Sequence, residues 1–255
     1  MPIAVHHEVT GPPDAEVVVL SGSLGSELAM WDRQLDALAA YRVVRYDLRG
    51  HGRSPLPDGP STLADLGGDV VALLDRLEIE RASLVGVSIG GMISLWTAAH
   101  HPDRVRRLVP SFTSALMGPP EAWRERAELV RAEGTAVVAD AVIGRWFTPG
   151  FAAREPAFVR AMRDTIAGTP AEGYASLCHA IETMDLRDDL HAITAPTLVI
   201  AGSADPSTPP EQGAAVAQSI AGARFRLLEG AAHLGNVEHA DVYNAAVVAH
   251  LRGGA

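Results

Sequence analysis

Residues 86 to 91 read GVSIGG, in which one serine has a glycine two positions before it and another two positions after it. The preceding run, ASLVGV (82–87), is short and apolar, as expected of a buried strand, and GGMISLWTAAHH (90–101) has apolar residues at helical spacing. Ser88 is therefore predicted to lie in an abrupt strand-to-helix turn. Side chains at positions 86 and 90 would collide with neighbouring backbone there, and such a turn is typical of a nucleophilic serine.

The same alternation of short apolar runs and longer amphipathic runs extends along most of the chain, which predicts a mostly parallel sheet flanked by helices. Helices are expected at 63–79, 91–101 and 242–252. Several strands end at Gly, Ser or Asp, and open α/β sheets bind ligands beyond the carboxyl ends of their strands. The predicted strands are 3–9, 16–22, 41–47, 81–87, 105–111, 197–203 and 223–229.

The alternation stops between about residues 115 and 190. Four short helices without strands are predicted there, in the segments EAWRERAELVRAEG, TAVVADAVIGRWF, EPAFVRAMRDTI and PAEGYASLCHAIETM, which are separated by breakers such as TPG and GTP. A helical insertion of this length usually covers a pocket as a lid. We therefore expect one α/β domain over residues 1–255 that carries a helical cap at about 115–190.

Composition limits the possible partners. The chain of 255 residues is 47% apolar and 20% charged, as expected of a globular protein, and its 31 acidic against 21 basic residues give a net charge of −10. This balance argues against nucleic acid. No apolar run reaches about 18 residues and no signal peptide is recognisable, so no membrane partner is expected. The only cysteine, Cys178, is consistent with a reducing compartment, and a cytoplasmic protein is expected.

Two backbone N–H groups are predicted to stabilise an oxyanion. One belongs to Ile89, which directly follows Ser88 at the start of the predicted helix. The other is expected from the loop SGSLGS (21–26), after an earlier strand. Ser23 is the first choice for this donor, and Leu24 the next.

A serine nucleophile needs a histidine base and an acid to orient it. Asp205 follows the predicted strand TLVIAGS, and His233 follows ARFRLLE, so both fall at carboxyl ends of strands. The order Ser88, Asp205, His233 is that of the α/β-hydrolase template. These three residues are the predicted catalytic residues.

Other acids and histidines are alternatives for these roles. Asp205 could serve only to cap the following helix, and His51 in DLRGHGRS is the main rival base, although a glycine-rich turn favours a structural loop. Asp185, Asp188 and Asp189 are rival acids but precede the strand at 197–203. The histidine pairs 6/7 and 100/101 lack metal-ligand spacing, and GHG lacks the third glycine of a dinucleotide-binding motif, so no metal and no cofactor are predicted.

The chain resembles the α/β-hydrolase superfamily and, within it, the 3-oxoadipate enol-lactonases of aromatic catabolism. The matching segments are spread from Ser23 to His239: SLGSELAMWDRQL, RYDLRGHGRS, GVSIGGMISLW, RWFTPGFAAREP, TPAEGYASLCHAIETMDLRDDL, APTLVIAGSADPSTPP and AAHLGNVEHA. RWFTP and MDLRD are more specific to the enol-lactonases than GVSIGG or RGHG. The resemblance implies cofactor-free hydrolysis of 3-oxoadipate enol-lactone, a small anionic lactone.

A substrate carboxylate would need a local cation in a chain of net charge −10. Arg145 in RWFTP can pair with a carboxylate and Trp146 can form an apolar wall, and the resemblance points to the same two residues, with Leu24 as a further candidate contact. Alternatively, Arg145 is a solvated lid residue and Trp146 its core contact. Some relatives are fused to a decarboxylase, and the sequence leaves a homo-oligomer open.

The sequence is also compatible with two other functions. A broad carboxylesterase, or a lactonase of another pathway, would use the same three catalytic residues and be indifferent to Arg145. A non-catalytic small-molecule receptor on the same fold would bind tightly without turnover.

Overall fold

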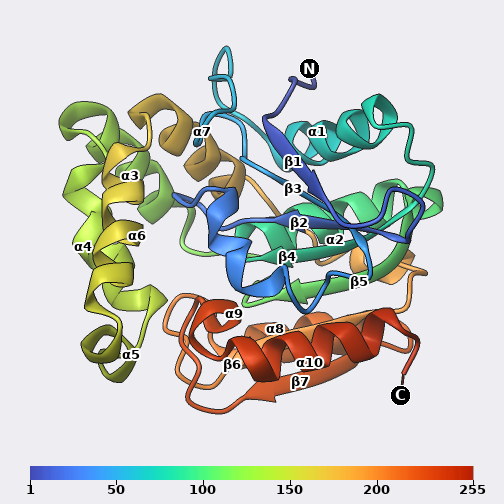
Figure 1. Ribbon diagram of the computed structural model, residues 1–255. Coiled ribbons are helices and arrows are strands. Elements are labelled where there is room, and N and C mark those ends of the chain that lie inside the picture. Colours follow the sequence, from blue (N-terminus) through green and yellow to red (C-terminus); the bar gives the residue numbers. More distant parts are fainter. Residues whose placement is uncertain (255) are drawn as a thin grey trace.

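The computed structural model describes residues 1–254 and contains one seven-stranded sheet in the order β1-β3-β2-β4-β5-β6-β7 (Figure 1). Strand β1 is antiparallel to β3, and every other neighbouring pair is parallel. The predicted mostly parallel sheet flanked by helices is therefore confirmed. The strands are β1 (His7–Thr10), β2 (Val17–Ser21), β3 (Arg42–Tyr46), β4 (Ala82–Val87), β5 (Val105–Ser111), β6 (Leu198–Gly202) and β7 (Arg224–Leu228).

The first strand is shorter than predicted. It begins at His7 and not at Ile3, because two of the preceding backbone N–H groups are bonded to side chains. The Ile3 N–H donates to Asp69 Oδ1 at 2.7 Å, and the His6 N–H donates to Ser54 Oγ at 2.8 Å. Such side-chain acceptors satisfy backbone donors without forming a ladder.

Helices α1 (Leu63–Arg76) and α2 (Ile89–His100) lie side by side on the sheet. A capping box formed by Thr62 and Asp65 starts α1, since each side chain accepts the other residue's backbone N–H. The two helices approach so closely that a Cβ at Gly67 would lie 2.0 Å from the Trp96 ring. Helix α2 is thereby held firmly at the end of β4.

The C-terminal half adds α8 (Pro210–Ser219), α9 (Gly235–Glu238) and α10 (Ala240–Leu251), and in Figure 1 α10 lies in front of β6 and β7 while α8 lies behind them. The 3₁₀ helix η1 (Leu28–Gln34) packs beside α10, where Gln34 Nε2 donates to Asn244 Oδ1 at 3.0 Å. Two further 3₁₀ turns are η2 (Pro102–Arg104) and η3 (Leu190–Ala192). Within residues 1–254, no helix combines the length and apolar character needed to cross a bilayer.

Between β5 and β6 the chain forms five helices, one more than predicted: α3 (Pro120–Glu133), α4 (Ala136–Trp146), α5 (Pro149–Arg154), α6 (Pro156–Gly168) and α7 (Ala171–Glu182). The additional helix, α5, has only six residues, too few for an apolar period to be visible. Its start is nonetheless a standard one, because the Thr148 hydroxyl accepts the Phe151 N–H and Pro149 occupies the first turn. We call helices α3 to α7 the lid.

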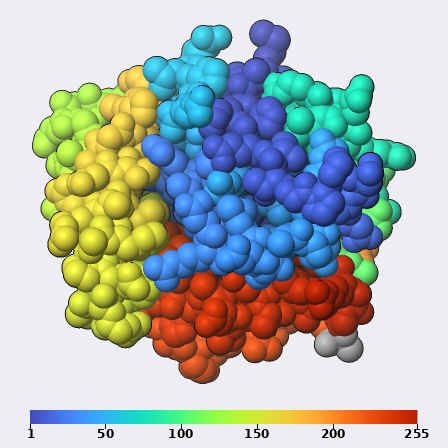
Figure 2. All heavy atoms as spheres, in the orientation of Figure 1, coloured from blue at the N-terminus to red at the C-terminus, as the bar shows by residue number. Residues whose placement is uncertain are grey.

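The lid lies beside the carboxyl ends of the strands (Figure 1). In Figure 2 its yellow-green atoms meet the orange-red atoms of the C-terminal segment along one continuous surface on this face. Within the lid, Phe147 and Phe151 stack with ring centroids 5.0 Å apart. Between the lid and the loop after β3, a Cβ at Gly173 of α7 would lie 2.1 Å from the Gly50 carbonyl oxygen. The lid is therefore packed directly onto the loops that follow the strands.

Candidate active site

Ser88 occupies the turn between β4 and α2, as predicted, with φ 60° and ψ −124°. A non-glycine residue in this region carries about 1–3 kcal/mol of backbone strain. Neighbouring groups hold the turn in place: the Ser88 N–H donates to the Ser111 carbonyl at 3.0 Å, and Thr113 Oγ1 donates to the Ser88 carbonyl at 2.7 Å. The serine thus stands at the N-terminal end of α2, where the helix dipole favours negative charge.

The two flanking glycines are required by close backbone contacts. A Cβ at Gly86 would lie 2.1 Å from the Gly90 carbonyl oxygen, and a Cβ at Gly90 would lie 2.0 Å from the Ser21 carbonyl oxygen. Both distances are far shorter than any real Cβ contact. The pattern GVSIGG therefore allows α2 to start against the ends of β2 and β4.

Asp205 and His233 lie in the loops after β6 and β7, and the structure brings them into contact. His233 Nδ1 is 2.8 Å from Asp205 Oδ2. Asp205 also accepts the N–H groups of Ser207 at 2.8 Å and Thr208 at 3.1 Å, and Thr208 Oγ1 donates to Asp205 Oδ2 at 2.7 Å. A carboxylate held in this way orients the imidazole and leaves Nε2 directed away from the acid.

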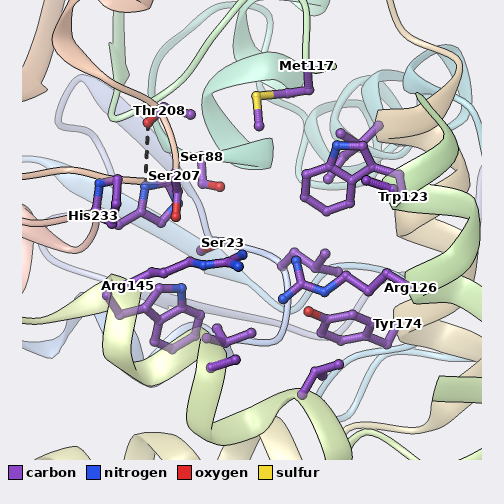
Figure 3. A pocket seen from close by; sticks show the side chains of 18 of the residues that line it. Ser23, Ser88, Met117, Trp123, Arg126, Arg145, Tyr174, Ser207, Thr208 and His233 are labelled. Carbon is purple, nitrogen blue, oxygen red and sulfur yellow. Dashed lines mark hydrogen bonds between the residues drawn. The ribbon is translucent and has the colours of Figure 1, made fainter. Parts of the chain in front are cut away.

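The charge of Asp205 is maintained despite its burial. Desolvation raises the pKa of the carboxyl, but the neighbouring His233 and the hydrogen bonds from His233 and Thr208 outweigh it, so that the net pKa lies below the usual value. Thr208 Oγ1 also lies 3.5 Å from His233 Nδ1, a contact drawn in Figure 3. Thr208 was not predicted from the sequence, because a threonine three residues after Asp205 in a proline-rich loop matches no motif.

Ser88 and His233 both line one cavity of about 590 Å³ between the lid and the strand ends. No hydrogen bond joins the Ser88 hydroxyl to His233 within residues 1–254, and in Figure 3 the hydroxyl points into the cavity. Nucleophile–base contacts are often loose until substrate is bound. The structure therefore places all three predicted catalytic residues at one site, with two of them already hydrogen-bonded.

The two predicted oxyanion donors come from different segments of the chain. Ile89 is the first residue of α2, so its N–H has no acceptor within the helix. Ser23 follows β2 and lines the cavity, and its N–H donates to the Met30 sulfur 3.4 Å away. A thioether is a weak acceptor, so a substrate oxyanion would compete effectively for this donor. The roles of Ser23 and Ile89 remain predictions.

His51, the rival base, has a structural position outside the cavity lining. Its Nε2 accepts the Gly25 N–H at 3.0 Å, and its Nδ1 therefore donates to the Arg49 carbonyl at 3.1 Å. Burial lowers the pKa of His51 to about 4, which keeps the ring neutral and able to accept. Of the rival acids, Asp185 is exposed and pairs with Arg187. Neither His51 nor Asp185 contacts His233 or Ser88 in the described residues.

The three residues predicted to contact substrate all line the cavity. Leu24 and Trp146 are buried, with exposed fractions of 6% and 2%, while Arg145 is exposed at the end of α4 and extends into the cavity in Figure 3. The Arg145 carbonyl accepts the His233 N–H at 3.4 Å. The lid residue and the histidine are thus direct neighbours.

Sequence analysis missed a second arginine on the opposite wall. Arg126 of α3 points toward Arg145 across the cavity in Figure 3. Its guanidinium lies 5.4 Å from the ring centre of Trp123 and 5.7 Å from that of Tyr174. Neither Arg126 nor Arg145 forms an ion pair within the described part of the chain. The only available signal was the Trp–Arg spacing of three residues on an amphipathic helix, which is common on solvated helices.

Residues 1–254 contain no group of three or more side chains suited to hold a metal ion. The only cysteine, Cys178, is buried in α7, and burial raises the pKa of its thiol to about 12. The reactive groups that face the cavity are therefore Ser88 and His233, supported by Asp205.

Comparison with known proteins identifies the family of the chain. A family model described as alpha/beta hydrolase fold matches residues 16–240. The chain is 39% identical over 251 residues to 3-oxoadipate enol-lactonase 2 of Acinetobacter baylyi, covering 98% of this chain and 94% of that protein. It is 33% identical to RutD of Variovorax paradoxus, a protein named for carbamate hydrolysis, over 97% of this chain and 96% of that protein.

Among solved structures, the enol-lactonase from Burkholderia xenovorans LB400 superposes with a TM-score of 0.96 at 44% identity, covering 98% of this chain and 100% of that one. The similarity to enol-lactonases thus extends over nearly the whole chain, and it supports an ester or lactone hydrolase. On the strength of the matched family model and these relatives, the chain belongs to the alpha/beta hydrolase fold family.

Proposed function

We propose that this protein hydrolyses 3-oxoadipate enol-lactone to 3-oxoadipate through an acyl-enzyme, as a step in the breakdown of aromatic compounds. The observation that carries the proposal is the pair of guanidinium groups, Arg126 and Arg145, on opposite walls of the cavity that Ser88 and His233 line. Because the protein has a net charge of −10, two cations without ion-pair partners in the described residues are best explained by an anionic ligand. The names of the relatives support the same substrate.

The proposed reaction begins when His233 Nε2 takes the proton of the Ser88 hydroxyl and the Oγ attacks the lactone carbonyl. The N–H groups of Ile89 and Ser23 stabilise the oxyanion. The bond between the acyl carbon and the ring oxygen then breaks. The enolate that forms stays attached to the acyl chain, receives the proton from His233 and becomes a ketone, which leaves His233 neutral again. His233 next activates a water molecule, which releases the second carboxylate from Ser88.

The cavity suits both substrate and product. The lactone carries one pendant carboxylate and the product carries two, which matches a cavity with two arginines. Trp123, Tyr174 and Trp146 provide apolar walls that lower the local dielectric and strengthen these charge contacts. An enolate is a good leaving group, so modest activation by the serine, histidine and aspartate is sufficient.

The test is steady-state hydrolysis of the enol-lactone and of neutral p-nitrophenyl acetate by wild type, Arg145→Ala and Arg126→Ala. Arg131→Ala is the matched control, since Arg131 lies on α3 but pairs with Glu172 at the surface. We expect wild type to prefer the lactone. In either cavity variant the ratio of kcat/KM for the lactone to that for the ester should fall at least tenfold, which corresponds to about 1.4 kcal/mol of carboxylate binding. The control should behave as wild type.

Other outcomes identify the alternatives. If every variant hydrolyses the neutral ester at the same rate as the lactone, the protein is a broad carboxylesterase or acts on another lactone. Preferential turnover of a carbamate would instead favour the activity for which RutD is named. Tight binding of the lactone with no turnover, and with no burst of product from Ser88, would indicate a receptor. Ser88→Ala is the control for such a burst.

A further inference from the structure

The carboxylate of Glu238, the last residue of α9, connects the lid to the loop that carries His233. It accepts hydrogen bonds from the hydroxyl of Thr148 and from the Thr148 N–H at 3.3 Å, and its Oε2 also accepts the Ala232 N–H at 3.4 Å. Thr148 lies between α4 and α5 of the lid, and Ala232 directly precedes His233. One side chain thus bonds to both segments.

The backbones of the two segments are also joined directly. The His233 N–H donates to the Arg145 carbonyl at 3.4 Å, and the Leu234 N–H donates to the Trp146 carbonyl at 3.0 Å. Residues 145–148 therefore run beside residues 232–234. In Figure 1 this contact lies where α5 of the lid approaches α9.

The strengths of these bonds differ. The backbone bond between His233 and Arg145, at 3.4 Å, is at the long end of the hydrogen-bond range, and the two backbone N–H bonds to Glu238, at 3.3 and 3.4 Å, are similarly long. The Leu234–Trp146 bond, at 3.0 Å, has ordinary length, and the Thr148 hydroxyl makes the closest contact with Glu238. Hydrogen bonds to a carboxylate are roughly twice as strong as neutral ones. Glu238 is partly buried and lies outside the cavity lining, so it acts on the site only through the segments it holds.

We propose that Glu238 is a positioning residue that fixes the imidazole of His233 relative to Arg145 of the lid. The geometry of proton transfer and the placement of the cavity cation would then depend on the same carboxylate. A displacement of about 1 Å at a reacting group can lower the rate about 100-fold. The proposal rests on the proposed roles of Ser88 and His233 but not on the identity of the lactone.

The test compares Glu238→Gln, Thr148→Val and Thr148→Ser with wild type. Glutamine keeps one acceptor oxygen but replaces the other with a donor, so the bonds to Thr148 and Ala232 cannot all be retained. Valine removes the Thr148 hydroxyl, whereas serine keeps it. Glu16→Gln is the control, because it breaks a surface ion pair with Arg106 and removes the same charge far from the cavity.

We expect Glu238→Gln and Thr148→Val each to lower kcat at least tenfold on p-nitrophenyl acetate and to reduce the preference for the lactone. Thr148→Ser should retain wild-type values. The double variant Glu238→Gln/Thr148→Val should be no worse than Glu238→Gln alone, since the Thr148 contact is already disturbed in that variant. A purely stabilising role would instead lower Tm and leave kcat per folded molecule unchanged. That result, or additive losses in the double variant, would overturn the proposal.

Failure of the proposed function is distinguished by a probe that needs only the serine and its base. A p-nitrophenyl phosphonate reacts once with Ser88: the Oγ–P bond forms, p-nitrophenolate leaves and the hydroxyl proton passes to His233. Slower phosphonylation of Glu238→Gln than of Glu16→Gln supports positioning even if the enol-lactone is not a substrate. Equal rates would refute it.

Discussion

Replacement of Gly90 by alanine tests how closely the nucleophile turn fits the end of β2. The new Cβ would lie 2.0 Å from the Ser21 carbonyl oxygen, 2.4 Å from the Ser21 carbonyl carbon and 2.7 Å from the Gly22 carbonyl oxygen. All three atoms belong to backbone, so no side chain can rotate away. To reach even 3.0 Å, α2 and the β2 end must separate by about 1 Å.

This displacement has two expected effects. Overpacking of this kind costs about 3 kcal/mol, which lowers Tm by about 6–12 °C in a chain of this length. The loop after Ser21 carries Ser23, the predicted oxyanion donor, so a shift of about 1 Å should also lower kcat/KM about 100-fold. Differential scanning calorimetry and initial rates on the enol-lactone and p-nitrophenyl acetate measure the two effects separately.

Gly168→Ala is the matched control. A Cβ at Gly168, the last residue of α6, would meet no atom within 4 Å, and its φ is not positive. Alanine there should raise stability by about 0.4–1 kcal/mol and leave the rates unchanged. If Gly90→Ala instead matched wild type in both Tm and kcat/KM, the close contact between α2 and β2 would not be needed for the turn, and the explanation of GVSIGG would be wrong.

The remaining predictions concern the catalytic acid and the buried histidines. Asp205→Asn should leave the fold intact but lower kcat about 10⁴-fold, as in comparable Ser–His–Asp sites, because the amide no longer stabilises protonated His233; a stopped-flow burst at the wild-type rate would contradict this. Burial also lowers the pKa of His51 and His250 to about 4, so the unfolded chain binds more protons between pH 4 and 6.5. Stability contributed by the neutral rings is complete above pH 6.5 and is lost as the pH falls toward 4, at up to about 1.4 kcal/mol per pH unit for His51. Melts of wild type and His250→Gln at pH 5 and 6.5 measure this, and the variant should show the smaller difference.

Local patterns predicted the sheet, because they depend on short-range physics. Seven predicted strands correspond to seven observed ones, and interior strands such as β4 and β6 are buried and apolar along their length. The edge strands β1 and β7 are more exposed and mix apolar with charged residues. The short helix α5 was missed for the opposite reason: six residues are fewer than two helical turns, and its start depends on the cap formed by Thr148.

The sequence by itself determined the positions of Ser88, Asp205 and His233, because in this fold each falls at the carboxyl end of a strand and strand ends can be read from local pattern. Only the tertiary structure decided what surrounds them. Arg126 on α3, Glu238 on α9 and Thr148 in the lid make contacts with residues up to 90 positions away in the chain. Such contacts arise when the lid folds over the strand ends, and no periodicity along the chain encodes them.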